Sequence, residues 1–423
     1  MIYNTVKPSK SNPVYSVHIV NIDGKTLNVH DIVTELKRSE PENQLAQKVI
    51  IGLMNVPDSC GRLIEDQISV LNTVFVYAND GERVDEVFRG IVWDKRYTNK
   101  NKRFLTLVCY DGLIYFQKTE ESKFFEAGKQ TSEVSQSLCA DKGVSLIYKY
   151  ESIEHPKLPL SGKLADIFRS DLLEEVYKKT RKKSVMYMDK GNVYIETVGQ
   201  NETVPEIKRF ENAISSESDL NMDDVITQVA FTGKTDDDER VPIEKTITGD
   251  TDTFGTIQKI IRKGIDEEED KSEEDAEFLL YEYGKPKLKF SVEAIDNPFV
   301  RKGNKVKVVA GDMLNYYIVL SVSHDGINKT MTLTLELSES ESEKLKSSDE
   351  SIYSGKAVSL SYTPLYYASD SGEAVRYLSG MYYVYDAICF SGRYRITSDA
   401  ALCGVKPINE NVIGWVDKEH LTG

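Results

Sequence analysis

The sequence predicts a mainly β protein with an α+β insert. Many segments alternate apolar and polar residues with period two, turn signals such as Asp-Gly separate them, and few segments have helical spacing. The length of 423 residues suits roughly two to four domains, and 24 Tyr and 14 Phe help to supply their cores. We expect two antiparallel β-barrel-type domains, a middle α/β domain and a small C-terminal β-barrel.

The first expected domain covers residues 1–118. Its strands are bounded by turn signals at residues 23–24, 79–81 and 111–112. This spacing favours a closed or nearly closed antiparallel barrel. The expected strands are residues 14–20, 27–32, 45–53, 73–78, 86–93 and 104–110.

The second expected domain, residues 119–209, combines helices and strands. Residues 132–142 have helical spacing and end before Gly143, and residues 158–183 are expected to form a second helix capped by Ser161. Its basic residues 178–183 suit a helix C-terminus better than a nucleic-acid patch. Two strands follow at residues 184–188 and 192–196.

The third expected domain, residues 210–337, is a β unit with a long helix. Helices are expected at residues 254–263 and 266–283, the second with an acidic first half. The acidic residues 234–239 and 267–275 lack the spacing of an EF-hand and are interpreted as solvated. The expected strands are residues 225–233, 241–249, 288–294, 305–310, 316–324 and 330–337.

The C-terminal part begins with a linker at residues 338–352, which is rich in Ser, Glu and Lys. Residues 353–423 have the size and texture of an SH3-like barrel, with strands expected at 359–362, 380–385, 392–397 and 413–416. Its many tyrosines either fill the barrel core or form an exposed aromatic groove for a partner, peptide or glycan. The candidate binding aromatics are Tyr366, Tyr367, Tyr382, Tyr383 and Trp415.

Composition and motifs exclude several classes of function. The net charge of -15 disfavours phosphate backbones and anionic membrane surfaces. Neither a long apolar span nor a signal-peptide core occurs, so we expect assembly in the bacterial cytoplasm. Scattered Cys residues indicate free thiols in a reducing compartment. These are Cys60, Cys109, Cys139, Cys389 and Cys403.

No catalytic, cofactor-binding or metal-binding residue is predicted. His18, His30, His155, His324 and His420 are far apart in the sequence and form no zinc motif. Cys389 or Cys403 with His420 could form a thiol nucleophile, but no helix N-terminus is expected beside either Cys to lower its pKa. Phosphate-binding loops and a GxSxG motif are also missing from the sequence. We therefore expect a protein without a cofactor.

The order of several segments resembles the baseplate hub proteins of contractile phage tails, especially those of PBSX-like prophages and R-type, phage-tail-like bacteriocins. The resemblance covers about residues 12–337, and the order and spacing of the segments carry it. These are VFRGIV at 87–92, LTLVCYD at 105–111, FGTIQ at 254–258, EFLL at 277–280, VRKGNKVKV at 300–308, YIVLSVSH at 317–324 and MTLTL at 331–335.

The resemblance implies a structural role in a phage or bacteriocin particle. Residues 1–118 and 210–337 would be the two hub domains, and three chains would form a six-part ring between a six-fold tail tube and a three-fold spike. The implied partners are the tube protein, the spike and other baseplate subunits, with neither sequence-specific nucleic-acid binding nor membrane insertion.

The C-terminal module resembles SH3-like modules on tail and cell-wall-associated proteins of Gram-positive systems. Its ligand could be peptidoglycan or another baseplate subunit. Two alternatives for the whole chain stay open: a tail-associated cell-wall hydrolase and a peptidoglycan-binding protein.

Overall fold

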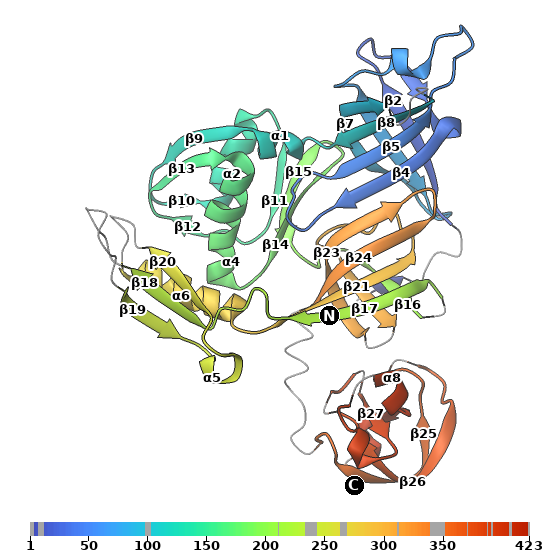
Figure 1. Ribbon diagram of the computed structural model, residues 1–423, viewed down its shortest axis with the longest axis vertical. Coiled ribbons are helices and arrows are strands. Elements are labelled where there is room, and N and C mark those ends of the chain that lie inside the picture. The colour runs from blue at the N-terminus through green and yellow to red at the C-terminus, as the bar shows by residue number, and fades with distance from the viewer. Residues whose placement is uncertain are drawn as a thin grey trace.

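The computed structural model confirms a mainly β architecture with several sheets (Figure 1). It describes residues 4–6, 12–97, 103–209, 211–232, 243–262, 269–310, 313–338, 352–369, 371–386, 388–390, 392–405 and 408–421.

The first β unit contains seven strands of a larger sheet, in the order β4-β5-β8-β7-β6-β2-β3. Alternate residues such as Val17, Ile19 and Ile51 point into one core and are at most 1% exposed, as the period-two pattern predicts. The strands are β2 (Val14–Val20), β3 (Thr26–Asn28), β4 (Val33–Glu40), β5 (Lys48–Met54), β6 (Thr73–Asn79), β7 (Val84–Tyr97) and β8 (Phe104–Tyr110).

The second β unit continues the same sheet. β4 pairs antiparallel with β23 over Lys37–Glu40 and Val322–Asp325, so the two units share one sheet. Among the described residues the strands of neither unit close on themselves, and β4 pairs with β5 on one side and with β23 on the other. The further strands are β1 (Asn4–Val6), β16 (Thr203–Lys208), β17 (Ala213–Asn221), β21 (Lys287–Ile295), β22 (Lys305–Ala310), β23 (Met313–Asp325) and β24 (Thr330–Leu337).

The middle unit packs helices against small sheets around Phe116, Leu138 and Phe168. The expected helix over residues 158–183 is wrong in its first part, where β13 (Leu158–Lys163) pairs with β9 (Glu120–Phe125). Pro159 and Gly162 disfavour a helix there. The remaining elements are α1 (Leu113–Lys118), β10 (Lys129–Gln130), α2 (Thr131–Asp141), β11 (Leu146–Lys149), β12 (Glu154–His155), α3 (Leu164–Asp166), a π-helical turn (Ile167–Leu173), α4 (Glu174–Thr180), β14 (Ser184–Asp189) and β15 (Asn192–Thr197).

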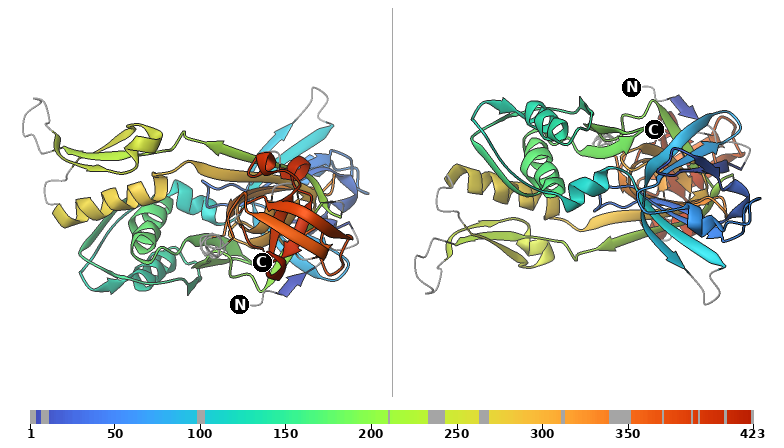
Figure 2. Two further views of the ribbon diagram at one scale, coloured as in Figure 1. Left: turned by 90° about the horizontal axis from the view of Figure 1, so that it is seen from below. Right: turned by 90° about the horizontal axis from the view of Figure 1, so that it is seen from above.

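A small sheet, β19-β18-β20, packs against α6 (Glu269–Tyr283) through Val229, Phe231 and Ala276. Figure 2 shows α6 between this sheet and the helices of the middle unit, where Lys178 of α4 pairs with Asp275 at 2.6 Å. The helix expected at residues 254–263 is wrong: α5 (Thr251–Phe254) is short, and the following segment pairs parallel with β18. The strands are β18 (Gln228–Thr232), β19 (Ile243–Thr248) and β20 (Gln258–Arg262). The acidic residues 234–239 lie outside the described residues.

The C-terminal unit, red in Figure 1, is a four-stranded antiparallel sheet. A bridge between Tyr366 and Trp415 brings its first and last strands together, and Leu360, Val384 and Ile396 lie in its core. Of the expected linker 338–352, residues 339–351 lie outside the described residues. The elements are β25 (Ala357–Leu365), β26 (Arg376–Val384), β27 (Arg393–Thr397), α8 (Ile408–Asn411) and β28 (Gly414–Asp417).

Candidate functional site

The five histidines are dispersed over the fold. His18 packs edge-on against Tyr77, His30 is exposed, and His420 lies 3.8 Å from Glu419. His155 is buried, with its Nε2 atom 2.8 Å from the Thr131 hydroxyl. Among the described residues no group of three His, Cys, Asp or Glu side chains could hold a metal ion. None of the described helices is long and apolar enough to span a bilayer.

Three of the five cysteines have raised thiol pKa values. Burial raises the pKa of Cys109 and Cys403, and it raises that of Cys139 to about 12. Cys60 is exposed and Cys389 is half-buried. Because the thiolate is the reactive form, the raised pKa values disfavour nucleophilic chemistry at Cys109, Cys139 and Cys403.

The most unusual polar cluster lies where β4 meets β23. We call the side chains of Tyr15, Arg38, Glu40, Asp296, Arg301 and His324 the junction. Alternation along β4 places Leu36, Arg38 and Glu40 on the inner face, and both charged residues are 4% exposed. Charged groups are rarely buried unless they are paired, so each must find partners there.

Arg38 and His324 both bind backbone carbonyl oxygens, and His324 also binds the Asp296 carboxylate. The Arg38 guanidinium donates to the carbonyl oxygens of Val87 and Pro298, in the first and second units. His324 Nδ1 lies 2.6 Å from Asp296 Oδ1 and its Nε2 lies 3.1 Å from the carbonyl oxygen of Val300. The Tyr15 hydroxyl donates to the other Asp296 oxygen. The cluster therefore ties β2 and β4 to the loop after β21.

Arg301 connects three units of the chain. Its Nε lies 3.2 Å from Glu40 Oε1, its Nη2 donates to the Met188 carbonyl oxygen at 2.9 Å, and its guanidinium stacks over Tyr187. Burial alone would raise the pKa of Glu40, but Arg301 and Arg38 hold that pKa below its usual value. The Glu40 carboxylate is therefore charged, and Arg301 is its direct partner.

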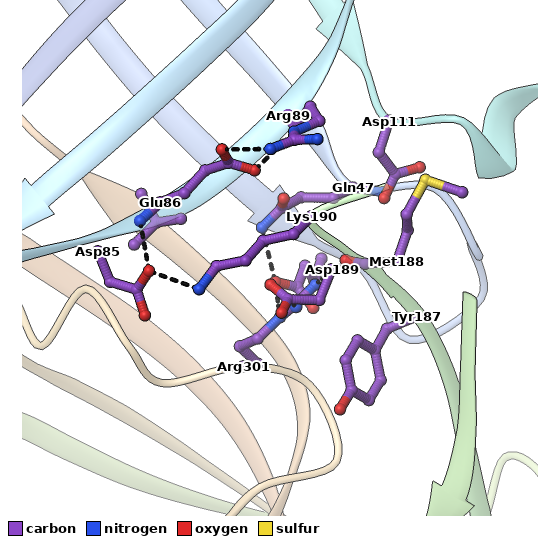
Figure 3. A network of polar contacts seen from close by, with 12 residues as sticks. Gln47, Asp85, Glu86, Arg89, Asp111, Tyr187, Met188, Asp189, Lys190 and Arg301 are labelled. Carbon is purple, nitrogen blue, oxygen red and sulfur yellow. Dashed lines mark hydrogen bonds and ion pairs between the residues drawn. The ribbon is translucent and has the colours of Figure 1, made fainter. Parts of the chain in front are cut away.

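The turn between β14 and β15 carries a second set of contacts to the first unit. Lys190 at this turn pairs with Asp85 of β7 at 2.7 Å, and Figure 3 shows both beside the ion pair of Glu86 with Arg89. Burial opposes ionisation of Asp85, but hydrogen bonds from Arg83 and Lys190 lower its pKa to about 2. The ion pair of Lys190 with Asp85 thus joins the middle unit to the first β unit, and the contacts of Arg301 join it to the second.

The junction has no room for a substrate. Its cavity, lined by Tyr15, Arg38 and His324, measures about 10 Å³, which is no more than one water molecule needs. Burial lowers the pKa of His324, and Arg38 acts in the same direction. We conclude that the junction holds the fold together.

The expected binding aromatics of the C-terminal unit are dispersed. Trp415 is 2% exposed and contacts Arg395, and Tyr366 lies under the Arg393 guanidinium. Tyr382 packs against the core and Tyr383 is half-buried, while Tyr367 is exposed. These residues are divided between the interior and the surface.

Two exposed tyrosines that the sequence analysis did not select lie together instead. Tyr362 and Tyr377 are 74% and 53% exposed, and their rings stack with centroids 4.5 Å apart and planes within 11°. They are 15 positions apart in the sequence, so only the pairing of β25 with β26 brings them together.

Comparison with known proteins supports the sequence-based resemblance. The family model described as YQBQ-like matches residues 61–338, which is more than half of the chain. This protein belongs to the YQBQ-like family. No curated protein matches the sequence.

Solved structures confirm the resemblance to phage tail proteins at the level of the fold. A tail protein from Neisseria meningitidis is 12% identical, with a TM-score of 0.56, over 76% of this chain and 96% of that chain. The 43 kDa tail protein of prophage MuSo2 from Shewanella oneidensis is 9% identical, with a TM-score of 0.56, over 76% of this chain and 98% of that chain. This chain therefore has a fold similar to that of tail proteins.

Proposed function

We propose that this chain is a structural baseplate hub of a contractile phage tail or a phage-tail-like bacteriocin, and that it has no enzymatic activity. Three copies form a ring that joins the six-fold tail tube to the three-fold spike. The chain is assembled in the bacterial cytoplasm and functions in the tail baseplate. Its partners are the tube protein, the spike and other baseplate subunits.

The observation that carries this proposal is the continuous sheet formed by β4 and β23. A symmetry adaptor needs two similar units per chain at a fixed angle, because three chains then present six units to the tube. Direct strand pairing and the buried junction provide that rigidity. A shift between the units would break the contact of Glu40 with Arg301, and a buried charge without its partner is strongly destabilising. The hub domains in this proposal are residues 1–118 and 210–337.

The remaining parts have separate roles in the proposal. Residues 119–209 form the middle domain, which is fixed to both hub domains through Arg301 and Lys190. Residues 338–352 are the linker, and residues 353–423 form an SH3-like module that contacts peptidoglycan or another baseplate subunit. A ring lumen of acidic or neutral character would let a polyanion pass without binding, in keeping with the net charge of -15.

An assembly experiment tests the proposal. The full chain is mixed with its spike protein, and the stoichiometry is measured by native mass spectrometry at several salt concentrations. The expected product contains three copies of the chain, and the free chain can remain monomeric until the spike templates the ring. A zymogram on peptidoglycan tests the alternative of a cell-wall hydrolase, and cleared bands at the mass of this chain would favour that alternative.

A further inference from the structure

The geometry points to a binding platform for a neutral glycan strand on the outer face of β25 and β26, formed by the stacked rings of Tyr362 and Tyr377. This inference deepens the role proposed for the C-terminal module and does not depend on ring formation by the hub domains.

A β-bulge aims Tyr362 at solvent. The register between β25 and β26 shifts between Leu360 and Thr363, so that Ser361 and Tyr362 together oppose Ser379. Tyr362 has a φ of +47°, which is an uncommon and costly backbone conformation for a large side chain. Its backbone N–H donates to the Ser379 hydroxyl at 2.9 Å, which fixes the bulge. Bulges of this kind often redirect a side chain at a functional site.

The two rings stack face to face. At 4.5 Å between centroids and 11° between planes, Tyr362 and Tyr377 leave no slot between them, so only the outer face and the edges of each ring are open to a ligand. A proline-rich peptide docks between aromatic side chains that line a groove. An open ring face instead suits the flat C–H face of a pyranose, because the face of an aromatic ring is negatively polarised and attracts C–H groups.

The surroundings of the rings select a neutral ligand. Alternation along β26 places Tyr377, Ser379 and Met381 on the outer face, opposite Pro364 and the bulge of β25. All of these residues are neutral, and the Tyr377 hydroxyl can exchange hydrogen bonds with the hydroxyls of a sugar. An anionic polymer would need basic residues on this face, and a chain of net charge -15 repels it. We therefore assign the platform to a neutral chain of pyranose units.

The test uses the full chain and chitohexaose as the probe, with the dissociation constant measured by calorimetry and contacts by saturation-transfer NMR. Tyr377→Ala removes one ring, and Tyr362→Gly removes the other at a positive φ that glycine adopts without strain. Thermal melts of both variants show whether they stay folded at the temperature of the binding assay. We expect each variant to bind about two- to tenfold more weakly, as one lost stacking contact implies. Tyr362→Phe keeps the ring and should bind like the wild type.

The matched control is Tyr353→Ala, which removes a similarly exposed tyrosine (60%) outside the stacked pair and should leave binding unchanged. A pull-down on purified peptidoglycan with the same variants tests whether the glycan ligand belongs to the cell wall. The variants that bind chitohexaose more weakly should also bind peptidoglycan more weakly. The inference is overturned if millimolar chitohexaose does not bind, if Tyr362→Gly binds as tightly as the wild type, or if a proline-rich peptide binds instead. The stoichiometry with the spike should be the same in all variants, so failure of glycan binding and failure of the hub proposal are distinguishable.

Discussion

Replacement of Arg301 by Ala should loosen the connection between the two β units. The Arg301 side chain is 17% exposed and its Nε lies 3.2 Å from Glu40, whose side chain is 4% exposed. Removing one partner of a buried ion pair leaves the other charge unpaired, which costs about 3–5 kcal/mol. The lost stacking on Tyr187 adds about 1 kcal/mol. Arg38 remains near Glu40 and offsets part of this cost, so we expect a loss of at least about 3 kcal/mol.

The appropriate assay is native-state hydrogen exchange on peptides that contain β4, β14 and β23, because it measures the opening free energy of each region separately. Arg301→Ala should lower the opening free energy of β4 and β23 more than that of the C-terminal unit. Arg169→Ala is the matched control: its ion pair with Asp166 has side chains 55% and 53% exposed and should contribute well under 1 kcal/mol.

A double variant separates the ion pair from simple packing. Arg301→Met with Glu40→Gln removes both charges, retains much of the volume and leaves an amide to bond Gln47. It should be more stable than Arg301→Met alone, since no buried charge is left without a partner. A change below about 1 kcal/mol in Arg301→Ala, or a double variant whose loss equals the sum of the single losses, would refute this account of the junction.

Three other predictions concern pH, packing and the linker. Burial raises the pKa of Asp111 to about 7, so the folded chain keeps a proton that the unfolded chain loses near pH 4. The contribution of Asp111 to stability should therefore fall by up to about 4 kcal/mol as pH rises from 4 to 7, and Asp111→Asn should flatten this slope in urea titrations. Gly90→Ala would place a Cβ atom 2.2 Å from the Tyr110 carbonyl oxygen and should cost about 1–3 kcal/mol or more, whereas Gly372→Ala, with open space around it, should be neutral in the same thermal melts. Limited proteolysis should cut first within residues 338–352 and leave a C-terminal fragment of roughly 70 residues, and first cleavage inside 359–416 would contradict the predicted module.

Strands with one apolar face were predictable from the sequence. The strands expected at residues 14–20, 104–110, 305–310 and 330–337 coincide with β2, β8, β22 and β24. Alternation is informative here because the buried positions are occupied by apolar residues. The bounds of the helix expected at 132–142 lie within one residue of those of α2. This helix was predictable because its apolar residues recur at helical spacing.

The junction was not predictable because its buried positions are charged. β4 alternates correctly, but its inner face includes Arg38 and Glu40, which resemble solvent-exposed residues in a sequence. Arg38 binds the Pro298 carbonyl oxygen and Glu40 binds Arg301, 260 and 261 residues later, and the pairing of β4 with β23 brings these segments together. Charged residues at the inward positions of a predicted strand are the signal that could have pointed to this site.

The helix expected at residues 254–263 did not form because part of that segment pairs as a strand. Residues 254–263 have apolar residues at helical spacing, but Ile260 and Ile261 are β-branched, and pairing with β18 provides hydrogen bonds for the segment as a strand. The aromatic pair of Tyr362 and Tyr377 depends on a β-bulge, and a positive φ at a tyrosine leaves no sequence signal. In both cases the structure depends on strand pairing between distant segments, which local sequence patterns do not show.

The copy number of the chain in an assembled baseplate tests the central claim most directly. Native mass spectrometry of the complex reconstituted with its spike, together with an electron-microscopy view of that complex, gives both the stoichiometry and the arrangement of the β units. We predict three copies of the 47.8 kDa chain, with six β units around a lumen of acidic or neutral character. A stable dimer, or a lumen lined mainly by Lys and Arg, would contradict the account.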